Sequence, residues 1–356
     1  MPGREDIVWS ARGTTPAQIE AALREMLARC HAENESCVPA RALNLICVVD
    51  AARRAEIEER LRQVGRYHAS RTILCVVEPG RAGIDAAATI AAEFDPAPGE
   101  FAVLRETVVV QVGEHQVPHL DTVVGPLVVT DLPTVVWAPH GHGEAVRALL
   151  GLAQVVLLDS VDAPDLRDAL RRAREPLERA YVVDLAWLRS TPWRERVAAT
   201  FDPPDLRPDL AEISAVAVRH HPQSAVAALL LVGWLASRLG WEPHPLDGGG
   251  DRLGGSARGP ARDVRISLEP AADLGVQGLA GLTLETASGR WLSLDRGPGG
   301  LRAHYRNARG DERRWTVLGA SRGEAGILGE GIRQALLRDP TYAPALEAAG
   351  ELAPAA

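Results

Sequence analysis

The chain has 356 residues, of which 46% are hydrophobic and 24% are charged, and its net charge is −8. This length allows two domains, each with its own core, and the composition is that of a folded protein rather than a disordered one. An acidic chain without a concentrated basic tract argues against nucleic-acid binding, which depends on neutralising phosphates. All 39 basic residues are arginine, since the sequence contains no lysine.

The sequence predicts a cytoplasmic protein that does not enter a membrane. No apolar signal core follows the first residues, Met1–Asp6. The most apolar stretch, Ala225–Ala236, is shorter than the roughly 20 residues that a membrane-spanning helix needs. Cys47 and Cys75 lie in apolar runs and predict reduced, structural thiols, while a redox-active Cys30–Cys37 pair stays open as an alternative.

The first half of the chain alternates between helical patterns and apolar strand patterns. Thr15–Gln18 is a capping box that predicts a helix starting at Pro16. Two nearly continuous apolar runs, Leu43–Val49 and Ile73–Val77, flank a helical pattern, which is typical of a βαβ unit with buried parallel strands. Further strand and helix patterns follow as far as residue 175. We therefore expect residues 1–175 to form an α/β domain with a mainly parallel sheet.

The second half predicts an α+β domain over residues 176–356 with an antiparallel meander. The expected parts in chain order are a connector over 176–209, a core helix over 222–240, a mobile glycine-rich loop over 244–262, the meander over 279–318, and C-terminal helices. The meander is expected because four short alternating runs are separated by turn signals such as Gly297–Gly300.

The sequence shows no convincing catalytic, cofactor or metal site. A phosphate-binding loop of the usual type needs a lysine, and so does Schiff-base chemistry. The first strand-to-helix turn, Val49–Arg53, lacks the glycines of a dinucleotide-binding fingerprint. His115 and His119 have a zinc-like spacing, but Pro118 lies between them. We therefore predict no catalytic residue, no cofactor and no metal.

One segment combines tryptophan, arginine and proline in an unusual density: Asp184-Leu-Ala-Trp-Leu-Arg-Ser-Thr-Pro-Trp-Arg-Glu195. Thr191 is expected to cap a helix whose first residue is Pro192, with Trp193 on its packed face. Two interpretations stay open. The tryptophans can close the interface between the two domains, or Trp and Arg can form a partner-binding hot spot with the arginines facing outward.

This segment resembles the signature of OpcA-type glucose-6-phosphate dehydrogenase assembly proteins. Other stretches resemble that family in the same order along the chain: Ala40–Ile46, His68–Ile73, Val124–Trp137 and Leu231–Trp241. The resemblance implies a non-catalytic factor that binds glucose-6-phosphate dehydrogenase, favours its active conformation or oligomer, and supports the oxidative pentose phosphate pathway and NADPH supply.

From this resemblance we place the partner surface on two segments. The hypothesis names Trp187, Arg189, Pro192, Trp193 and Arg194 in one segment, and Asp131, Leu132 and Pro133 in the other. Two alternatives remain on the same α/β scaffold. One is a sugar-phosphate enzyme, a lactonase or isomerase in which Arg71 could hold a phosphate. The other is a module that senses a sugar phosphate or nucleotide.

Overall fold

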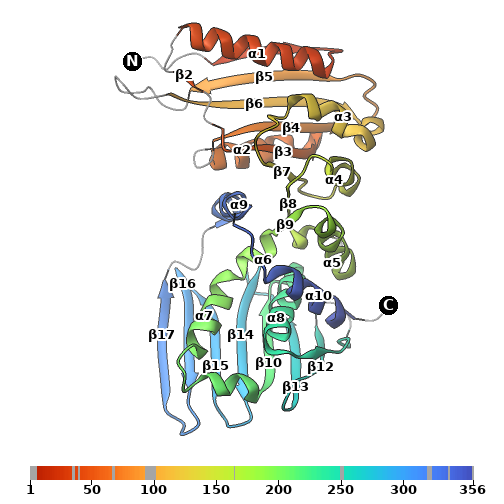
Figure 1. Cartoon of the computed structure of the whole chain (residues 1–356). Coiled ribbons are helices and arrows are strands. Elements are labelled where there is room, and N and C mark those ends of the chain that lie inside the picture. Colours follow the sequence, from red (N-terminus) through yellow and green to blue (C-terminus); the bar gives the residue numbers. More distant parts are fainter. Residues whose placement is uncertain are drawn as a thin grey trace. The chain divides into compact units, whose positions relative to one another are not determined.

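The computed structural model describes residues 6–33, 37–38, 41–65, 69–92, 102–163, 165–248, 252–318, 323–335 and 337–354, and it separates into two compact units (Figure 1). Unit 1 comprises Met1–Leu158, Pro176–Val183 and Leu328–Leu337, and unit 2 comprises Asp159–Glu175, Asp184–Ile327 and Arg338–Ala356. This division differs from the expected boundary at residue 175. Helix α5 (Leu166–Arg174) belongs to unit 2 because it packs against two helices of that unit, α8 (Ala225–Leu239) and α10 (Tyr342–Leu352).

Unit 1 is built on a nine-stranded sheet of mixed direction that is mostly parallel, as predicted. The strand order is β1-β5-β6-β4-β3-β7-β8-β9, and β2 pairs with β6. Strands β6, β4, β3, β7 and β8 are parallel to one another. Strand β5 is antiparallel to β6, and β1 is antiparallel to β5. The bounds are β1 Ile7–Ala11, β2 Cys37–Val38, β3 Leu43–Asp50, β4 Ser70–Glu78, β5 Asp85–Ala92, β6 Ala102–Gly113, β7 Thr134–Trp137, β8 Val155–Leu158 and β9 Tyr181–Asp184.

Four helices of unit 1 connect or cover these strands: α1 Pro16–Glu33, α2 Arg54–Gly65, α3 Leu120–Val124 and α4 Gly143–Leu149. The capping box at the start of α1 is confirmed. The backbone N–H of Thr15 donates to Gln18 Oε1 (3.0 Å), and the backbone N–H of Gln18 donates to Thr15 Oγ1 (3.4 Å). The core of this unit lies between α1 and the sheet, where Ile19, Leu23 and Ile73 are fully or almost fully buried. Helix α9 (Gly323–Gln334) has residues in both units.

Unit 2 contains an eight-stranded sheet that is mostly antiparallel, also as predicted. Its strand order is β11-β12-β13-β10-β14-β15-β16-β17, and β10 and β13 are its one parallel pair in the described register. Figure 1 shows α7 (Thr191–Phe201) and α8 lying over the same face of this sheet. The bounds are β10 Ile213–His220, β11 Glu242–Pro243, β12 Leu253–Arg258, β13 Asp263–Pro270, β14 Leu279–Thr286, β15 Trp291–Gly297, β16 Gly300–Arg306 and β17 Glu312–Leu318.

Two predicted segments of the second half have more regular structure than expected. The mobile loop over 244–262 contains β12, so that prediction is wrong for Leu253–Arg258, whose pairing with β13 supplies the order that a glycine-rich sequence does not suggest. The connector over 176–209 contains β9, α6 (Leu185–Arg189) and α7. The four strands β14–β17 occupy the segment expected to form the meander.

The predicted core helix is α8, which follows a short 3-10 turn at Pro222–Ser224. Among the described helices, the segment Pro222–Leu239 is the one with the length and apolar composition of a membrane span, but 67% of it is buried inside the structure. Its Leu229, Leu230 and Leu231 are fully buried, which is the pattern of a core helix. Helix α8 ends at Gly240, whose left-handed φ of 67° closes the last turn.

Candidate functional site

The tryptophan- and arginine-rich segment starts at the end of β9 and forms α6 and α7. Asp184 is the N-cap of α6, because its Oδ1 accepts from the Ala186 amide at 2.9 Å. Such a cap satisfies a backbone amide that has no partner within the helix. Ser190 separates the two helices, and its hydroxyl donates to the Trp187 carbonyl at 2.7 Å. The segment is therefore fixed by its own side chains.

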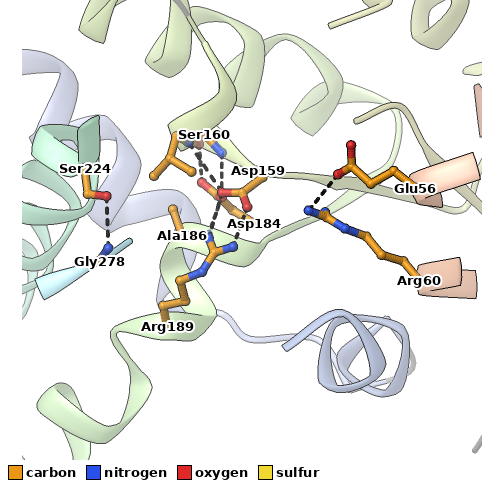
Figure 2. A network of polar contacts seen from close by, with 10 residues as sticks. Glu56, Arg60, Asp159, Ser160, Asp184, Ala186, Arg189, Ser224 and Gly278 are labelled. Carbon is orange, nitrogen blue, oxygen red and sulfur yellow. Dashed lines mark hydrogen bonds and ion pairs between the residues drawn. The ribbon is translucent and has the colours of Figure 1, made fainter. Parts of the chain in front are cut away.

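Asp184 is also the centre of a buried polar cluster, the Asp184 cluster, which consists of Asp159, Ser160, Asp184, Arg189 and Tyr342 (Figure 2 shows its first four members). The Ser160 amide donates to Asp184 Oδ1 at 3.1 Å, and the Ser160 hydroxyl donates to Oδ2. The Tyr342 hydroxyl donates to the same Oδ2 at 3.0 Å. The fully buried carboxylate thus joins β9 and α6 to the turn at Ser160 and to the start of α10.

Burial raises the pKa of Asp184 to about 6, and the nearby negative charge of Asp159 adds to this shift. The hydrogen bonds from Ser160 and Ala186 act in the opposite direction, because they stabilise the ionised form. Asp184 therefore changes its charge near neutral pH while remaining inside the protein.

Arg189, in the last turn of α6, forms a two-pronged ion pair with Asp159. Its Nη1 and Nη2 lie 2.9 and 2.7 Å from the two carboxylate oxygens. Both side chains are less than 10% exposed, so the pair is shielded from water. Paired geometry of this kind is the strong form of an Arg–carboxylate contact. Figure 2 shows the Arg189 guanidinium directed at Asp159 beside the Asp184 carboxylate.

Trp187 and Arg194 form a second contact inside unit 2, together with Asp339. The Arg194 guanidinium lies 3.5 Å from the centre of the Trp187 ring, which is a close cation–π contact. Trp187 Nε1 donates to Asp339 Oδ2 at 2.9 Å, and Arg194 Nη1 lies 3.6 Å from the same oxygen. Burial lowers the pKa of Arg194 to about 10, although the Asp339 charge opposes that shift.

The pKa of Asp339 is lowered, although its partial burial favours the neutral form. Hydrogen bonds from the Thr341 hydroxyl and amide and from Trp187 outweigh the burial, and the Arg194 charge adds to them. An ionised Asp339 therefore balances the buried guanidinium of Arg194. Trp187 completes the contact by packing edge-on against Tyr342 of the Asp184 cluster, with 5.5 Å between ring centres.

The structure places the predicted site residues of this segment largely inside the protein. Trp187 and Trp193 are 2% and 1% exposed, and Pro192 is half-buried. The prediction that the arginines face outward is wrong for Arg189 and Arg194, because Asp159 and Asp339 hold their charges inside. Helix α7 begins one residue earlier than expected, with Ser190 as its N-cap in place of Thr191. A partner-binding role for these residues stays a prediction.

The other predicted site segment is the turn before β7 in unit 1. Asp131 is exposed, while Leu132 and Pro133 are half-buried. The buried Asn44 side chain in β3 holds this turn, since its Nδ2 donates to the carbonyls of Val129 (3.0 Å) and Leu132 (3.3 Å). The exposed Asp131 side chain is compatible with the predicted partner contact, which stays a prediction.

The geometry of the Asp184 cluster does not favour catalysis. A serine hydroxyl bonded to a carboxylate is one element of a nucleophile, but Ser160 and Asp184 are 4% and 0% exposed. No group of three or more His, Cys, Asp or Glu side chains within the described residues could hold a metal ion. The cluster stabilises the fold of the segment, because Arg189 pairs with Asp159 and the Asp184 carboxylate accepts hydrogen bonds from Ser160, Ala186 and Tyr342.

Arg71, the candidate phosphate ligand of the alternative enzyme hypothesis, is engaged elsewhere in unit 1. Its Nε lies 2.8 Å from Glu106 Oε2, and its Nη1 donates to the Leu127 carbonyl at 2.9 Å. Arg71 also lies at the amino end of β4, whereas ligands of parallel sheets bind at the carboxyl ends. It is therefore poorly placed to hold a sugar phosphate.

The thiols of the strands fit the structural interpretation. Cys47 and Cys75 are fully buried, and burial raises the pKa of Cys75 to about 12. Such thiols are unreactive at neutral pH. Cys30 is buried in α1, but the side chain of Cys37 lies outside the described part of the structure, so their pairing stays an open prediction.

Sequence reasoning missed four residues that organise these sites: Asn44, Asp159, Asp339 and Tyr342. Asn44 carried a signal, because it is the one polar residue inside the apolar run Leu43–Val49. The other three have no local signal for this role, since the residues that they bind in these sites, Arg189, Trp187 and Asp184, lie from 30 to 158 residues away along the chain.

Comparisons with known proteins give family matches over most of the chain. A model described as the N-terminal domain of a glucose-6-phosphate dehydrogenase subunit, named OpcA_G6PD_assem, matches residues 61–175. A model described as the C-terminal domain of the same dehydrogenase subunit, named OpcA_G6PD_C, matches residues 180–346. The second match contains the whole of α6 and α7.

Curated relatives match over a shorter part. The OxPP cycle protein OpcA of Synechococcus elongatus is 30% identical over 39% of this chain and 32% of its own length. The protein of the same name from Synechocystis sp. is 32% identical over 34% of this chain and 26% of its own length. The matched part therefore spans about a third or less of these relatives.

Solved structures resemble the chain more distantly. An oxidoreductase domain protein from Kribbella flavida has 11% identity and a TM-score of 0.46, covering 87% of this chain and 95% of that chain. Myo-inositol 2-dehydrogenase from Lactobacillus plantarum has 9% identity and a TM-score of 0.45, covering 87% and 94%. Likeness at this level carries no conclusion about activity.

Proposed function

Because the chain belongs to the OpcA family of glucose-6-phosphate dehydrogenase assembly proteins, we propose that it binds that dehydrogenase and favours its active conformation or oligomer without catalysing a reaction itself. The observation that carries the proposal is the pair of family matches, both described as parts of a dehydrogenase subunit, over 61–175 and 180–346. In this role the chain acts in the cytoplasm and supports the oxidative pentose phosphate pathway and its NADPH supply.

The geometry of unit 2 supports a factor that works through its surface. Arg189 and Arg194 of the tryptophan- and arginine-rich segment pair with Asp159 and Asp339 from other parts of unit 2 instead of facing a solvent-filled site. Buried pairs of this type favour a single arrangement of the elements that carry them. A fixed arrangement of α6, α7 and α10 gives a partner a preformed surface, which lowers the entropic cost of binding.

The size of the required effect is modest. A shift of the dehydrogenase from 1% to 99% active needs a preference of about 5.5 kcal/mol for the active state. One interface of standard size, burying about 800 Å² on each partner, can supply that difference when it contains a few well-packed anchors. The proposal therefore requires contact with one state of the enzyme and no reactive side chain.

Co-purification tests the proposal directly. We expect the full chain to be retained by immobilised glucose-6-phosphate dehydrogenase from the same organism, and to hydrolyse no sugar-phosphate lactone when assayed alone. Failure to bind the dehydrogenase, or turnover of a sugar phosphate by the isolated chain, would contradict it.

The structure changes which variants suit this test. Glutamate at Arg189 or Arg194 would leave Asp159 or Asp339 beside an added negative charge inside the protein, so both variants should unfold more easily. Asp131→Arg alters an exposed side chain and keeps the fold. Loss of binding in that variant with an unchanged melting temperature would support the Asp131–Pro133 turn as part of the partner surface.

A further inference from the structure

The eight-stranded sheet of unit 2 has one face packed against helices and one face without a described helix of this unit (Figure 1). Residues of β10, β13, β14 and β15 alternate between the two faces. Those on the packed face are almost fully buried and apolar: Val216, Val218, Ile266, Leu268, Leu282, Leu284, Leu292 and Leu294. The other face, which we call the open face, carries the polar and charged residues between them.

The middle row of the open face, row 2, has small side chains on four strands. Ser267, Ala217, Thr283 and Ser293 lie opposite one another on β13, β10, β14 and β15, and the row continues to the larger His304 on β16 and Arg314 on β17. The four small residues are half-buried and uncharged. Side chains of this size allow another protein surface to approach the sheet closely. By themselves they do not identify that surface, so the charges on either side must.

A charged row, row 1, borders the small residues on one side. Across β13, β10, β14, β15 and β16 it reads Glu269, Arg219, Gly281, Asp295 and Arg302. The order of charges is therefore negative, positive, neutral, negative, positive. A second copy related by a 180° rotation about an axis along β14 presents row 1 in the reverse order. Every charge of one copy then faces a charge of opposite sign in the other. Row 1 is thus complementary to itself.

Row 3, on the other side of the small residues, reads Arg265, Ala215, Glu285, Trp291 and Arg306 across the same five strands. Sheets that pack face to face usually cross at about 30°, so a two-fold axis lies about 15° from each strand direction. Over the roughly 13 Å between rows 1 and 3, this tilt displaces the axis by roughly 3.5 Å, about three-quarters of one strand spacing. The axis then crosses row 3 beside Glu285 and not on it.

This displacement makes row 3 complementary as well. If the axis meets row 3 at Ala215, then Arg265 faces the second copy's Glu285. If it meets row 3 at Trp291, then Glu285 faces the second copy's Arg306. Either direction of tilt therefore sets opposite charges against each other in both rows.

Charge pairs within one copy already reach across the small residues of these rows. Arg219 pairs with Asp295 across Gly281, and a Cβ at Gly281 would collide with the Arg219 guanidinium. Arg265 lies 3.8 Å from Glu285 across Ala215. In a two-fold pair, Arg219 and Asp295 of both copies would meet around the axis as four alternating charges.

We propose that the open face binds a second copy of this chain, forming a two-fold dimer of unit 2 sheets. Seven strands, β12–β17 with β10, give this face about 700 Å² from strand spacing and length. That area approaches the roughly 800 Å² that each partner contributes to an interface of standard size. The dimer is independent of dehydrogenase binding and adds a defined stoichiometry to it.

Charge exchange within one chain tests the dimer. The full chain should have the mass of two copies by light scattering after size exclusion. In the proposed pair Glu269 faces the second copy's Arg302, so Glu269→Arg or Arg302→Glu alone places like charges together. We expect each single variant to dissociate at least tenfold more readily. The double variant Glu269→Arg/Arg302→Glu should restore the wild-type dimer, because each charge again meets its opposite.

The control is Glu195→Arg, which makes the same reversal at an exposed position of α7, over the packed face, and should leave the dimer unchanged. Melting temperatures of all variants establish that they fold. A monomeric wild type, or single variants as dimeric as the wild type, would overturn the proposal. The proposal would also be overturned if the chain were monomeric and both the single and the double variants lost dehydrogenase binding, because the open face would then bind the enzyme.

Discussion

At the scale of single residues, Asp184 connects three parts of unit 2. Its two oxygens accept four hydrogen bonds, from the Ser160 amide and hydroxyl, the Ala186 amide and the Tyr342 hydroxyl. The carboxylate is fully buried, so water cannot replace these bonds if it is removed. The position of α6 relative to α10 therefore depends on this one side chain.

Replacement of Asp184 by alanine should lower the free energy of unfolding by about 2–4 kcal/mol, because two buried amides and two hydroxyls lose their acceptor. Asp165→Ala is the matched control. It removes the exposed cap of α5, whose carboxylate accepts from the Asp168 amide at 2.8 Å, and should cost about 1 kcal/mol. Urea unfolding of both variants measures the difference, and equal losses would contradict a central role for Asp184.

The raised pKa of Asp184 predicts a pH dependence of stability. Its pKa is about 6 in the folded protein and lower in the unfolded chain, so between these values the folded state holds the proton more tightly. The contribution of Asp184 is then largest at acid pH and falls as the pH rises through about 6. Asp184→Asn removes this titration.

We therefore expect the stability of wild type minus that of Asp184→Asn to decrease from pH 4 to pH 6 and to stay constant above pH 7. Urea midpoints of both proteins across this range measure the difference. A difference that rises with pH would mean that Asp184 is ionised throughout.

At the scale of elements, the sequence predicted the strands that carry strong local patterns. The buried parallel strands β3 and β4 appear as continuous apolar runs, and β14–β17 appear as alternating runs between turns. Strands β5, β12 and β13 were among those missed, β13 although Val264, Ile266 and Leu268 alternate with polar residues. Asp85–Ala92 is mostly alanine and Leu253–Arg258 contains two glycines, and both residue types have low strand propensity. Pairing with β6 and β13 outweighs that propensity.

The candidate site shows the same division between local and distant information. The packed face of Trp193 follows from neighbouring residues, and both tryptophans were singled out from sequence, although the cap of α7 is Ser190 and not the predicted Thr191. The direction of Arg189 and Arg194 does not follow from it. Those side chains turn inward because Asp159 and Asp339, from distant parts of the chain, supply their counter-charges.

Helices α8 and α10 make a close contact that depends on Gly233. A Cβ at this position would lie 2.3 Å from the Ala345 carbonyl oxygen and 2.8 Å from the Ala349 amide nitrogen. Gly233→Ala must therefore push the α10 backbone away, and we expect a loss of about 1–3 kcal/mol. Calorimetric melting of the full chain measures this loss.

Gly350, in α10, is the matched control, since a Cβ there meets nothing within 4 Å. Gly350→Ala should leave stability unchanged or raise it by up to about 1 kcal/mol, because alanine favours the helix. If both variants melted at the wild-type temperature, the contact between α8 and α10 would be looser than described.

At the scale of the whole molecule, the family matches support our proposal of a protein that acts by contact. The described residues bury their strongest charge pairs within the fold and leave the open face of unit 2 and the turn at Asp131 at the surface. A molecule of this kind changes an enzyme by preferring one of its states, and the preference sets the largest effect that it can have.

The most direct measurement of this account is the specific activity and oligomer mass of glucose-6-phosphate dehydrogenase titrated with the purified chain. The account predicts that activity rises to a plateau at a fixed molar ratio, with a matching change in mass that shows the chain bound. An enzyme whose kinetics and mass stay the same in a large excess of the chain would contradict it.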